Sequence, residues 1–293
     1  MNFLSLLVIF MYSGTILSAC NTIKKYDAIF NFGDSISDTG NFLRSGSIAF
    51  PVIGKLPYGM TFFQRPTGRC SEGRLVVDFV AATFGLPYMP PYLALAEGGQ
   101  IFRHGVNFAV VGATALDPEF FRQWKIGSIL WTNDSLRVQL GWFSCGNYLK
   151  KSLFLVGEIG GNDYNYAFFS GGTIQQVEAL VPIVVEAIMK AIIALIEQGA
   201  VELVVPGNFP IGCSAAYLTF FQIPNKTDYD SNGCLKAFNN FFEFHNGRLK
   251  CALEKLRRKY RNVKIIYADY YGATMQFVTS PLQYGDQLLN FYN

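Results

Sequence analysis

A serine at a sharp turn after an apolar stretch is the first feature of this sequence that could perform chemistry. The run from Ala28 to Phe32 is apolar and leads directly into Gly33, Asp34 and Ser35. Such a run predicts a buried strand, and a serine just beyond its end can present its hydroxyl as a nucleophile. Gly-Asp-Ser is also ordinary turn chemistry, because Asp and Ser side chains bond to nearby backbone. The tripeptide alone therefore favours a simple turn, and a catalytic interpretation needs further groups at the same place.

Acyl transfer requires hydrogen-bond donors aimed at the oxyanion of the tetrahedral intermediate. The candidates are the backbone N–H groups of Ser35 and Gly112 and the side-chain amide of Asn162. Each lies in a glycine-containing turn that follows an apolar run. Gly112 alone could simply end a strand, and Asn162 alone could form an Asx turn. Together with Ser35 they indicate a serine hydrolase site.

The elements that must position these residues alternate along the chain. Beyond the first strand, strands are expected over residues 106–111, 152–156, 201–205 and 263–268, and helices over 74–84, 136–149, 174–198 and 235–260. This alternation predicts an α/β fold with three α/β/α layers around a parallel five-stranded sheet. Ligands bind beyond the carboxyl ends of the strands in such sheets, so the turns at 33–35, 112–113, 160–162 and 207–208 should meet at one edge. Residues 42–73 read as a long functional loop and residues 117–131 as irregular surface.

Composition limits the class of protein. The chain has 293 residues, of which 51% are hydrophobic and 15% charged, so a large core is expected and disorder is not. The formal charge of +3 and the lack of a basic stripe give no reason to expect a nucleic-acid partner. Residues 177–196 are apolar but interrupted by charges, which favours a buried amphipathic helix over a transmembrane anchor.

Residues 1–20 predict a secretory signal peptide, which leaves residues 21–293 as a single domain. The apolar stretch 3–11 is too short to span a bilayer, and the small residues Ser18 and Cys20 suit cleavage after Cys20. A membrane anchor is the alternative. Secretion would place the protein outside the cell, with the cell wall or the vacuole as alternative destinations, and its oligomeric state stays open.

Secretion also makes disulfides and glycans reasonable expectations. Removal of Cys20 leaves an odd number of cysteines, namely Cys70, Cys145, Cys213, Cys234 and Cys251. Cys213 and Cys234 flank one polar loop and are the preferred pair, and closing such a loop contributes about 3 kcal/mol. The tripeptides at Asn133 and Asn225 are glycosylation acceptors.

Three blocks in order resemble the plant GDSL esterase/lipase family of the SGNH hydrolases. They are residues 32–41 (FGDSISDTGN), 105–113 (GVNFAVVGA) and 157–163 (GEIGGND), and the similarity extends from about residue 25 to residue 279. The subgroup resembled includes sinapine esterase and acetylajmalan esterase. The resemblance implies a flavodoxin-like fold, Ser35 as nucleophile, and Gly112 and Asn162 as oxyanion donors. It also implies hydrolysis of carboxylic esters, including lipid, phenolic and sugar esters, with no metal or organic cofactor.

One departure from the family concerns the general base, which the family supplies from a C-terminal Asp-x-x-His pair. No such pair follows the fifth strand here, and the sequence holds only His104 and His245. His104 precedes the second strand, about eight residues and roughly 25 Å from Gly112, while His245 is expected to pack within a helix. Asp38 is expected to accept hydrogen bonds at a turn or helix start.

The general-base His and its Asp are thus expected to be absent, and the C-terminal element of the fold with them. The sequence predicts a secreted serine esterase whose activity is weak without that base. The alternatives are a catalytically impaired protein that binds esters or glycans and a poorly folded product.

Overall fold

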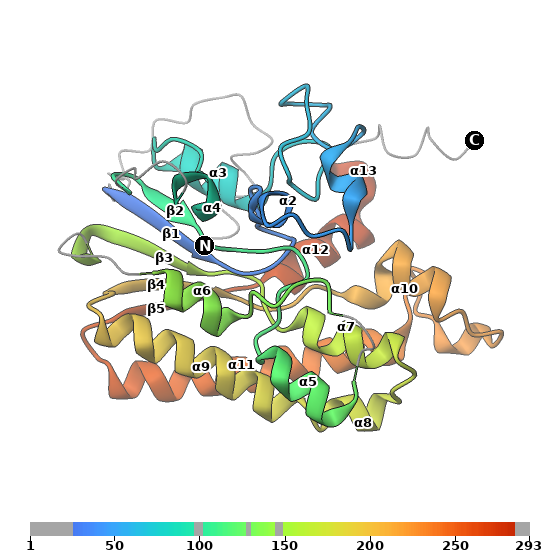
Figure 1. Cartoon of the computed structure of the whole chain (residues 1–293). Helices are drawn as coiled ribbons and strands as arrows, with labels where there is room; N and C mark the ends of the chain where they lie inside the picture. Colours follow the sequence, from blue (N-terminus) through green and yellow to red (C-terminus); the bar gives the residue numbers. More distant parts are fainter. Residues whose placement is uncertain (1–25, 97–101, 127–129, 144–148, 285–293) are drawn as a thin grey trace.

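Five parallel strands form the centre of the protein in the computed structural model, which describes residues 26–96, 102–126, 130–143 and 149–284 (Figure 1). The expected signal peptide lies outside these residues. The strands are β1 (Ala28–Phe32), β2 (Gly105–Asn107), β3 (Ser152–Val156), β4 (Glu202–Pro206) and β5 (Lys264–Ala268). They are hydrogen-bonded in the order β2-β1-β3-β4-β5, and every pair is parallel. This sheet confirms the predicted fold class.

Helices cover both faces of the sheet, as continuous apolar strands require. Side chains alternate along each strand, so that Ile29, Leu153 and Leu155 pack with α3 (Val76–Thr83) on one face. Phe30 and Phe154 belong to the opposite face, which packs against α6 (Leu136–Trp142), α9 (Val181–Glu197) and α11 (Lys236–Lys259). Figure 1 shows α3 on one side of the sheet and α9 and α11 on the other.

The shorter helices connect these layers. They are α2 (Asn41–Arg44), α4 (Tyr92–Ala96), α5 (Pro118–Trp124), α7 (Gly161–Phe169), α8 (Ile174–Glu178), α10 (Ala215–Phe220), α12 (Tyr270–Thr279) and α13 (Pro281–Tyr284), with 3₁₀ turns η1 (Pro51–Gly54), η2 (Leu149–Lys151), η3 (Ile211–Cys213) and η4 (Lys226–Asp228). Residues 42–73 are otherwise irregular, as expected. The buried pair of Arg69 and Asp78, with Nη2 2.7 Å from Oδ1, fastens this loop to α3.

One helical stretch among the described residues, Ile174–Glu197, is long and apolar enough to cross a membrane by length and composition. In the structure it comprises α8 and α9, and α9 buries the stripe Val181, Val184, Ile188, Ile192 and Leu195 against the core. This spacing of three to four residues is that of an amphipathic helix that packs one face against a protein core. The stretch breaks before Pro182, which has no N–H to donate to the Glu178 carbonyl.

Three further expected elements differ from the structure. The second strand ends at Asn107 rather than residue 111, because the Asn107 Oδ1 accepts from the Ala109 N–H at 2.9 Å and bends the chain into an Asx turn. Within residues 117–131, expected to be irregular, α5 begins at Pro118, a residue favoured at the first position of a helix. The helix expected over 136–149 ends at Trp142, and residues 144–148 lie outside the described part.

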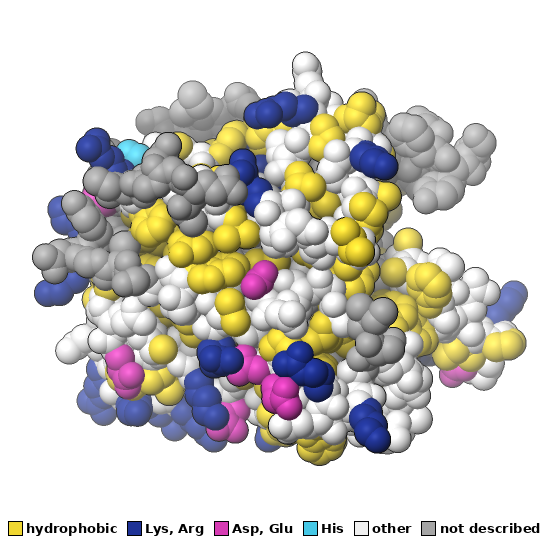
Figure 2. Space-filling model, viewed as in Figure 1, with side chains coloured by type: hydrophobic (Ala, Val, Ile, Leu, Met, Phe, Trp, Pro, Cys, Tyr) yellow, Lys and Arg dark blue, Asp and Glu magenta, His cyan; other side chains and the backbone are white. Residues whose placement is uncertain are grey.

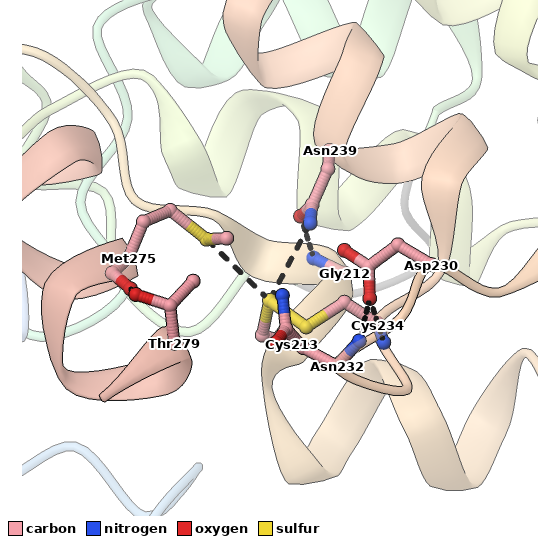
Figure 3. The surroundings of a disulfide bond; sticks show 8 residues. All are labelled: Gly212, Cys213, Asp230, Asn232, Cys234, Asn239, Met275 and Thr279. Atoms are coloured by element: carbon pink, nitrogen blue, oxygen red, sulfur yellow. Dashed lines mark hydrogen bonds between the residues drawn. A yellow bond between two sulfur atoms is a disulfide. The ribbon is translucent and has the colours of Figure 1, made fainter. Parts of the chain in front are cut away.

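A disulfide joins Cys213 and Cys234, the pair that the sequence favoured (Figure 3). It connects η3 to the residues just before α11 and so closes the excursion that carries α10. Asn239 supports this junction, since its Oδ1 accepts from the Gly212 N–H at 2.9 Å. The structure describes Cys70 and Cys251 as unpaired.

The face in Figure 2 has an uneven distribution of side chains. Lys, Arg, Asp and Glu are intermixed along its lower part, whereas apolar side chains are frequent on the upper right and right, where Figure 1 places residues 50–60 and α10. Among the exposed apolar residues are Ile48, Leu56 and Phe220, the last 71% exposed.

Candidate active site

Ser35 lies in a turn directly after β1, and a glutamine from α6 fixes this turn. The Gly33 N–H donates to Gln139 Oε1 at 2.9 Å, and Gln139 Nε2 donates back to the Gly33 carbonyl at 2.8 Å. The fully buried Gln139 thus pairs with both backbone groups of one residue, as a neighbouring strand would. We did not predict this role from the sequence. A polar residue on the apolar face of the expected helix 136–149 was the available signal.

A second set of side chains ties the turn to the chain after β2. Asn31 Nδ2 donates to Ser37 Oγ at 3.0 Å and to Asn107 Oδ1 at 2.9 Å. Asn41 Nδ2 donates to the carbonyls of Asn107 and Ala109, both at 2.9 Å. The nucleophile turn and the segment that leads to Gly112 are therefore one hydrogen-bonded unit.

Asp38 serves this unit as an acceptor, as expected from the sequence. Its carboxylate accepts the N–H groups of Gly40, Asn41, Phe42 and Val111 at 2.7–3.0 Å. Burial nevertheless raises the pKa of Asp38 to about 6. A carboxylate committed to four backbone donors orders the start of α2 and is not available as a base for Ser35.

The structure brings Ser35, Gly112 and Asn162 together in the lining of one pocket of about 430 Å³. The three come from the carboxyl end of β1, the segment after β2 and the first turn of α7. This is the edge at which the sequence placed their turns. The predicted nucleophile and the predicted oxyanion donors therefore share one site.

Gly112 occupies a position that only glycine fits. Its φ of +78° lies in the left-handed region, and a Cβ there would approach Trp131 Cβ to 2.8 Å and the Tyr166 hydroxyl to 3.1 Å. Tyr166 donates its hydroxyl to the Gly112 carbonyl at 3.1 Å and accepts the Trp131 N–H at 3.0 Å. Burial is the main cause that raises the pKa of Tyr166 to about 12, so this hydroxyl stays protonated. Tyr166 is a second supporting residue that we did not predict.

The Asn162 amide is held on both sides. Its Nδ2 donates to Asp34 Oδ2 and to the Ala113 carbonyl, both at 3.0 Å. Its Oδ1 accepts from Asn165 Nδ2 at 3.3 Å. Since both amide hydrogens have partners, an oxyanion in the pocket has to share one of them with Asp34 or Ala113.

Three buried carboxyl groups surround these donors. Burial is the largest cause that raises the pKa of Asp34 to about 6, that of Asp163 to about 7 and that of Glu158 well above its ordinary value. Asp163 accepts the Ala115 and Leu116 N–H groups at 2.8 and 2.9 Å and so fixes the chain after Gly112. Within the described residues, no group of three His, Cys, Asp or Glu side chains is arranged to hold a metal ion.

Both histidines lie away from the pocket lining. His104 is exposed at the amino end of the sheet, where its Nδ1 is 3.3 Å from the Asp27 carbonyl oxygen. His245 is buried in α11 with its Nδ1 2.7 Å from the Tyr164 hydroxyl, and burial lowers its pKa to about 3. Neither histidine is among the described residues that line the pocket of Ser35.

Aromatic side chains form much of the pocket wall. Trp131, Tyr166, Phe169 and Phe220 line it, together with Val111, Asn165 and Ser170. Trp131 stacks on Phe50 with ring centroids 5.1 Å apart, so the long loop 42–73 supports this wall. Of the aromatic run 164–169, Tyr166 and Phe169 line the pocket, whereas Tyr164 and Phe168 are buried in the core.

The two glycosylation candidates are accessible. Asn133 and Asn225 are both exposed, and Asn225 Oδ1 accepts the Thr227 N–H at 3.1 Å.

The sheet is parallel and five-stranded, and its carboxyl edge carries a Gly-Asp-Ser turn, a glycine with left-handed φ and a Gly-Asn turn. These features define a hydrolase of the SGNH type with a three-layer α/β fold. The model of the family described as GDSL-like Lipase/Acylhydrolase matches residues 29–287. The chain belongs to this family.

Curated plant relatives support this family membership. A GDSL esterase/lipase of Arabidopsis thaliana is 52% identical over 276 residues, which are 89% of this chain and 74% of the relative. The sinapine esterase of Brassica napus is 46% identical over 277 residues, 89% of this chain and 70% of that enzyme. Another Arabidopsis GDSL esterase/lipase is 45% identical over 299 residues, 96% of this chain and 77% of the relative. By family, the chain is a carboxylic ester hydrolase.

Proposed function

We propose that this protein is a secreted serine esterase in which Ser35 is the nucleophile. The observation that carries the proposal is the shared pocket of Ser35, Gly112 and Asn162. The Ser35 Oγ bonds to the carbonyl carbon of the ester and gives its proton to solvent water. The bond from that carbon to the alcohol oxygen then breaks, and the alcohol departs with a proton from water to leave an acyl-enzyme. Water then attacks the acyl-enzyme and releases the acid.

The oxyanion formed in each half of the reaction is stabilised by the N–H groups of Ser35 and Gly112 and by the Asn162 amide. One such donor is worth about 3–4 kcal/mol in the transition state. The two hydrogen bonds between Gln139 and Gly33, and the one from Tyr166 to the Gly112 carbonyl, hold the Ser35 turn and the Gly112 backbone in place before substrate arrives.

The pocket favours esters with an uncharged aromatic or apolar group. Trp131, Tyr166, Phe169 and Phe220 offer rings, and none of the described residues that line the pocket is charged. That one relative is named sinapine esterase agrees with an ester substrate. The proposed reaction uses no metal or organic cofactor and no nucleic-acid partner.

The disulfide of Cys213 with Cys234 and the exposed Asn133 and Asn225 support secretion. Disulfides persist in oxidising compartments, and glycan acceptors must be accessible. These features support the proposal that the protein acts outside the cell.

A second candidate is a protein that binds esters or glycans without turning them over. The observation that favours it is that neither His104 nor His245 lines the pocket of Ser35. A serine hydroxyl without a histidine base beside it is a weak nucleophile. Ligands that raise the melting temperature while no product forms would support this candidate.

The test is hydrolysis of p-nitrophenyl acetate by the chain expressed through a secretory pathway, with Ser35→Ala beside it. Ser231→Ala, at an exposed serine in the loop before α11, is the matched control. We expect hydrolysis in the wild type and in Ser231→Ala and its loss in Ser35→Ala. Equal rates in all three proteins would refute the esterase proposal.

A further inference from the structure

Asp34 and Glu158 form a buried carboxyl pair at the ends of β1 and β3. Asp34 is 2% exposed and Glu158 5% exposed, and a side-chain hydrogen bond joins them. The Asp34 N–H also donates to the Glu158 carbonyl at 3.2 Å. Two adjacent buried carboxyl groups cannot both be ionised at little cost, so they share a proton.

We assign the proton of this pair to Glu158, because both Asp34 oxygens already accept N–H groups, Oδ1 from Ile36 and Oδ2 from Asn162. The pKa directions agree: burial and the Asp34 charge raise the pKa of Glu158 well above its ordinary value, whereas burial raises that of Asp34 to about 6 against the opposing hydrogen bond with Glu158. Glu158 therefore donates and Asp34 accepts. The other titratable groups that interact with the pair are Asp38 and Asp163, which oppose further negative charge, together with Tyr270 of α12, Cys70 and Tyr166.

Asp34 connects this pair to the proposed catalytic groups. Its Oδ1 accepts the Ile36 N–H at 3.0 Å, which shapes the turn around Ser35, and a hydrogen bond links it to the Ser35 side chain. Its Oδ2 accepts Asn162 Nδ2 at 3.0 Å. One carboxylate thus orients both the nucleophile turn and the oxyanion amide.

Glu158 is anchored independently of Asp34. It accepts a hydrogen bond from the Gly161 N–H, at the start of the helix that carries Asn162. It also lines a small cavity of about 20 Å³ together with Asn31, Ser37 and Tyr270, and the rest of the lining is mostly apolar. The Glu158 carboxyl is therefore fixed at the start of α7, beside this cavity, while it donates to Asp34.

We propose that Glu158 is a positioning residue for ester hydrolysis, because its protonated carboxyl holds Asp34 and thereby sets the Ser35 turn and the Asn162 amide. This role rests on the esterase function proposed above. When Glu158 ionises, it loses the O–H that donates to Asp34, and the two carboxylates repel each other. The Ser35 turn and the Asn162 amide are therefore held at lower pH and become less well aligned as pH rises.

The test compares Glu158→Gln and Glu158→Ala with the wild type and with Ser35→Ala, in kcat and KM for p-nitrophenyl acetate across a pH series. Gln keeps an uncharged donor toward Asp34 and an acceptor toward Gly161, so its kcat should stay within about threefold of wild type. Ala leaves Asp34 without its donor, which should lower kcat by about 10- to 100-fold with little change in KM. Glu158→Gln should also lose the decline of kcat at higher pH that the wild type shows.

The proposal is overturned if Gln is as impaired as Ala, if both variants match the wild type, or if the loss falls on KM. Should Glu158→Ala fail to fold, the pH profiles of wild type and Glu158→Gln decide, and identical profiles overturn the proposal. Wild-type rates in Ser35→Ala would instead count against the proposed esterase function, so the two failures are distinguishable.

Discussion

Replacement of Gly112 by Ala tests whether the backbone at this position builds the oxyanion hole. The left-handed φ of +78° costs an alanine about 1–2 kcal/mol on its own. In addition, the new Cβ would lie 2.8 Å from Trp131 Cβ and 3.1 Å from the Tyr166 hydroxyl, where ordinary contacts begin at 3.4 Å. To make room for the Cβ, the pocket wall has to open by about half an ångström. Tyr166 and Trp131 move together because a hydrogen bond joins them.

Gly171→Ala is the matched control, because it shares the backbone cost without the crowding. Gly171 has a φ of +87°, and a Cβ added there would meet no atom within 4 Å. Both variants should lose about 1–2 kcal/mol of unfolding free energy. A displacement of 1 Å at a catalytic group costs about 100-fold in rate, so Gly112→Ala should lose about 10- to 100-fold in kcat. Gly171→Ala should keep the wild-type kcat.

The assay is kcat and KM for p-nitrophenyl acetate beside urea unfolding of the three proteins. Equal kcat values in Gly112→Ala and Gly171→Ala, at equal stability loss, would show that the Gly112 backbone plays no part in the reaction.

Three further predictions concern stability and processing. Asp78→Ala leaves the buried Arg69 guanidinium without its partner and should lower the unfolding free energy by about 3–5 kcal/mol; a loss below about 1 kcal/mol would contradict the anchoring role. Burial raises the pKa of Asp163 from 3.8 to about 7, so its contribution to stability is full below the lower value and is lost as pH rises through the higher one. Urea unfolding across this range should show a decline that is smaller in Asp163→Asn, and an equal decline would refute the assignment. Asn133→Gln and Asn225→Gln should each remove one glycosidase-sensitive mass step from the secreted protein, and an unchanged mass would exclude that acceptor.

The sequence predicted the sheet well because its strands are continuous apolar runs bounded by glycine turns. The ends of elements were less predictable, since local side-chain bonds decide them. Asn107 ends β2 by accepting the Ala109 N–H, and Pro182 divides the helical stretch that the apolar pattern joined. These local effects act within runs that the apolar pattern reads as continuous.

The candidate site was also predicted only in part. Ser35, Gly112 and Asn162 were recognisable because their residue types and their position after strands suit acyl transfer. Gln139, Tyr166 and Glu158 were not, because their roles arise from contacts between residues distant in sequence. Gln139 reaches Gly33 across 106 positions, and Tyr166 reaches Gly112 across 54.

The central claim is that Ser35 is a nucleophile, and covalent trapping tests it most directly. The secreted protein would be treated with a fluorophosphonate and digested with trypsin, and the peptide between Lys25 and Arg44 examined by mass spectrometry. Fragmentation would distinguish Ser35 from Ser37 in the same peptide. The account predicts one phosphonate adduct on Ser35, absent from Ser35→Ala. An unmodified peptide, or an adduct on a different residue, would contradict it.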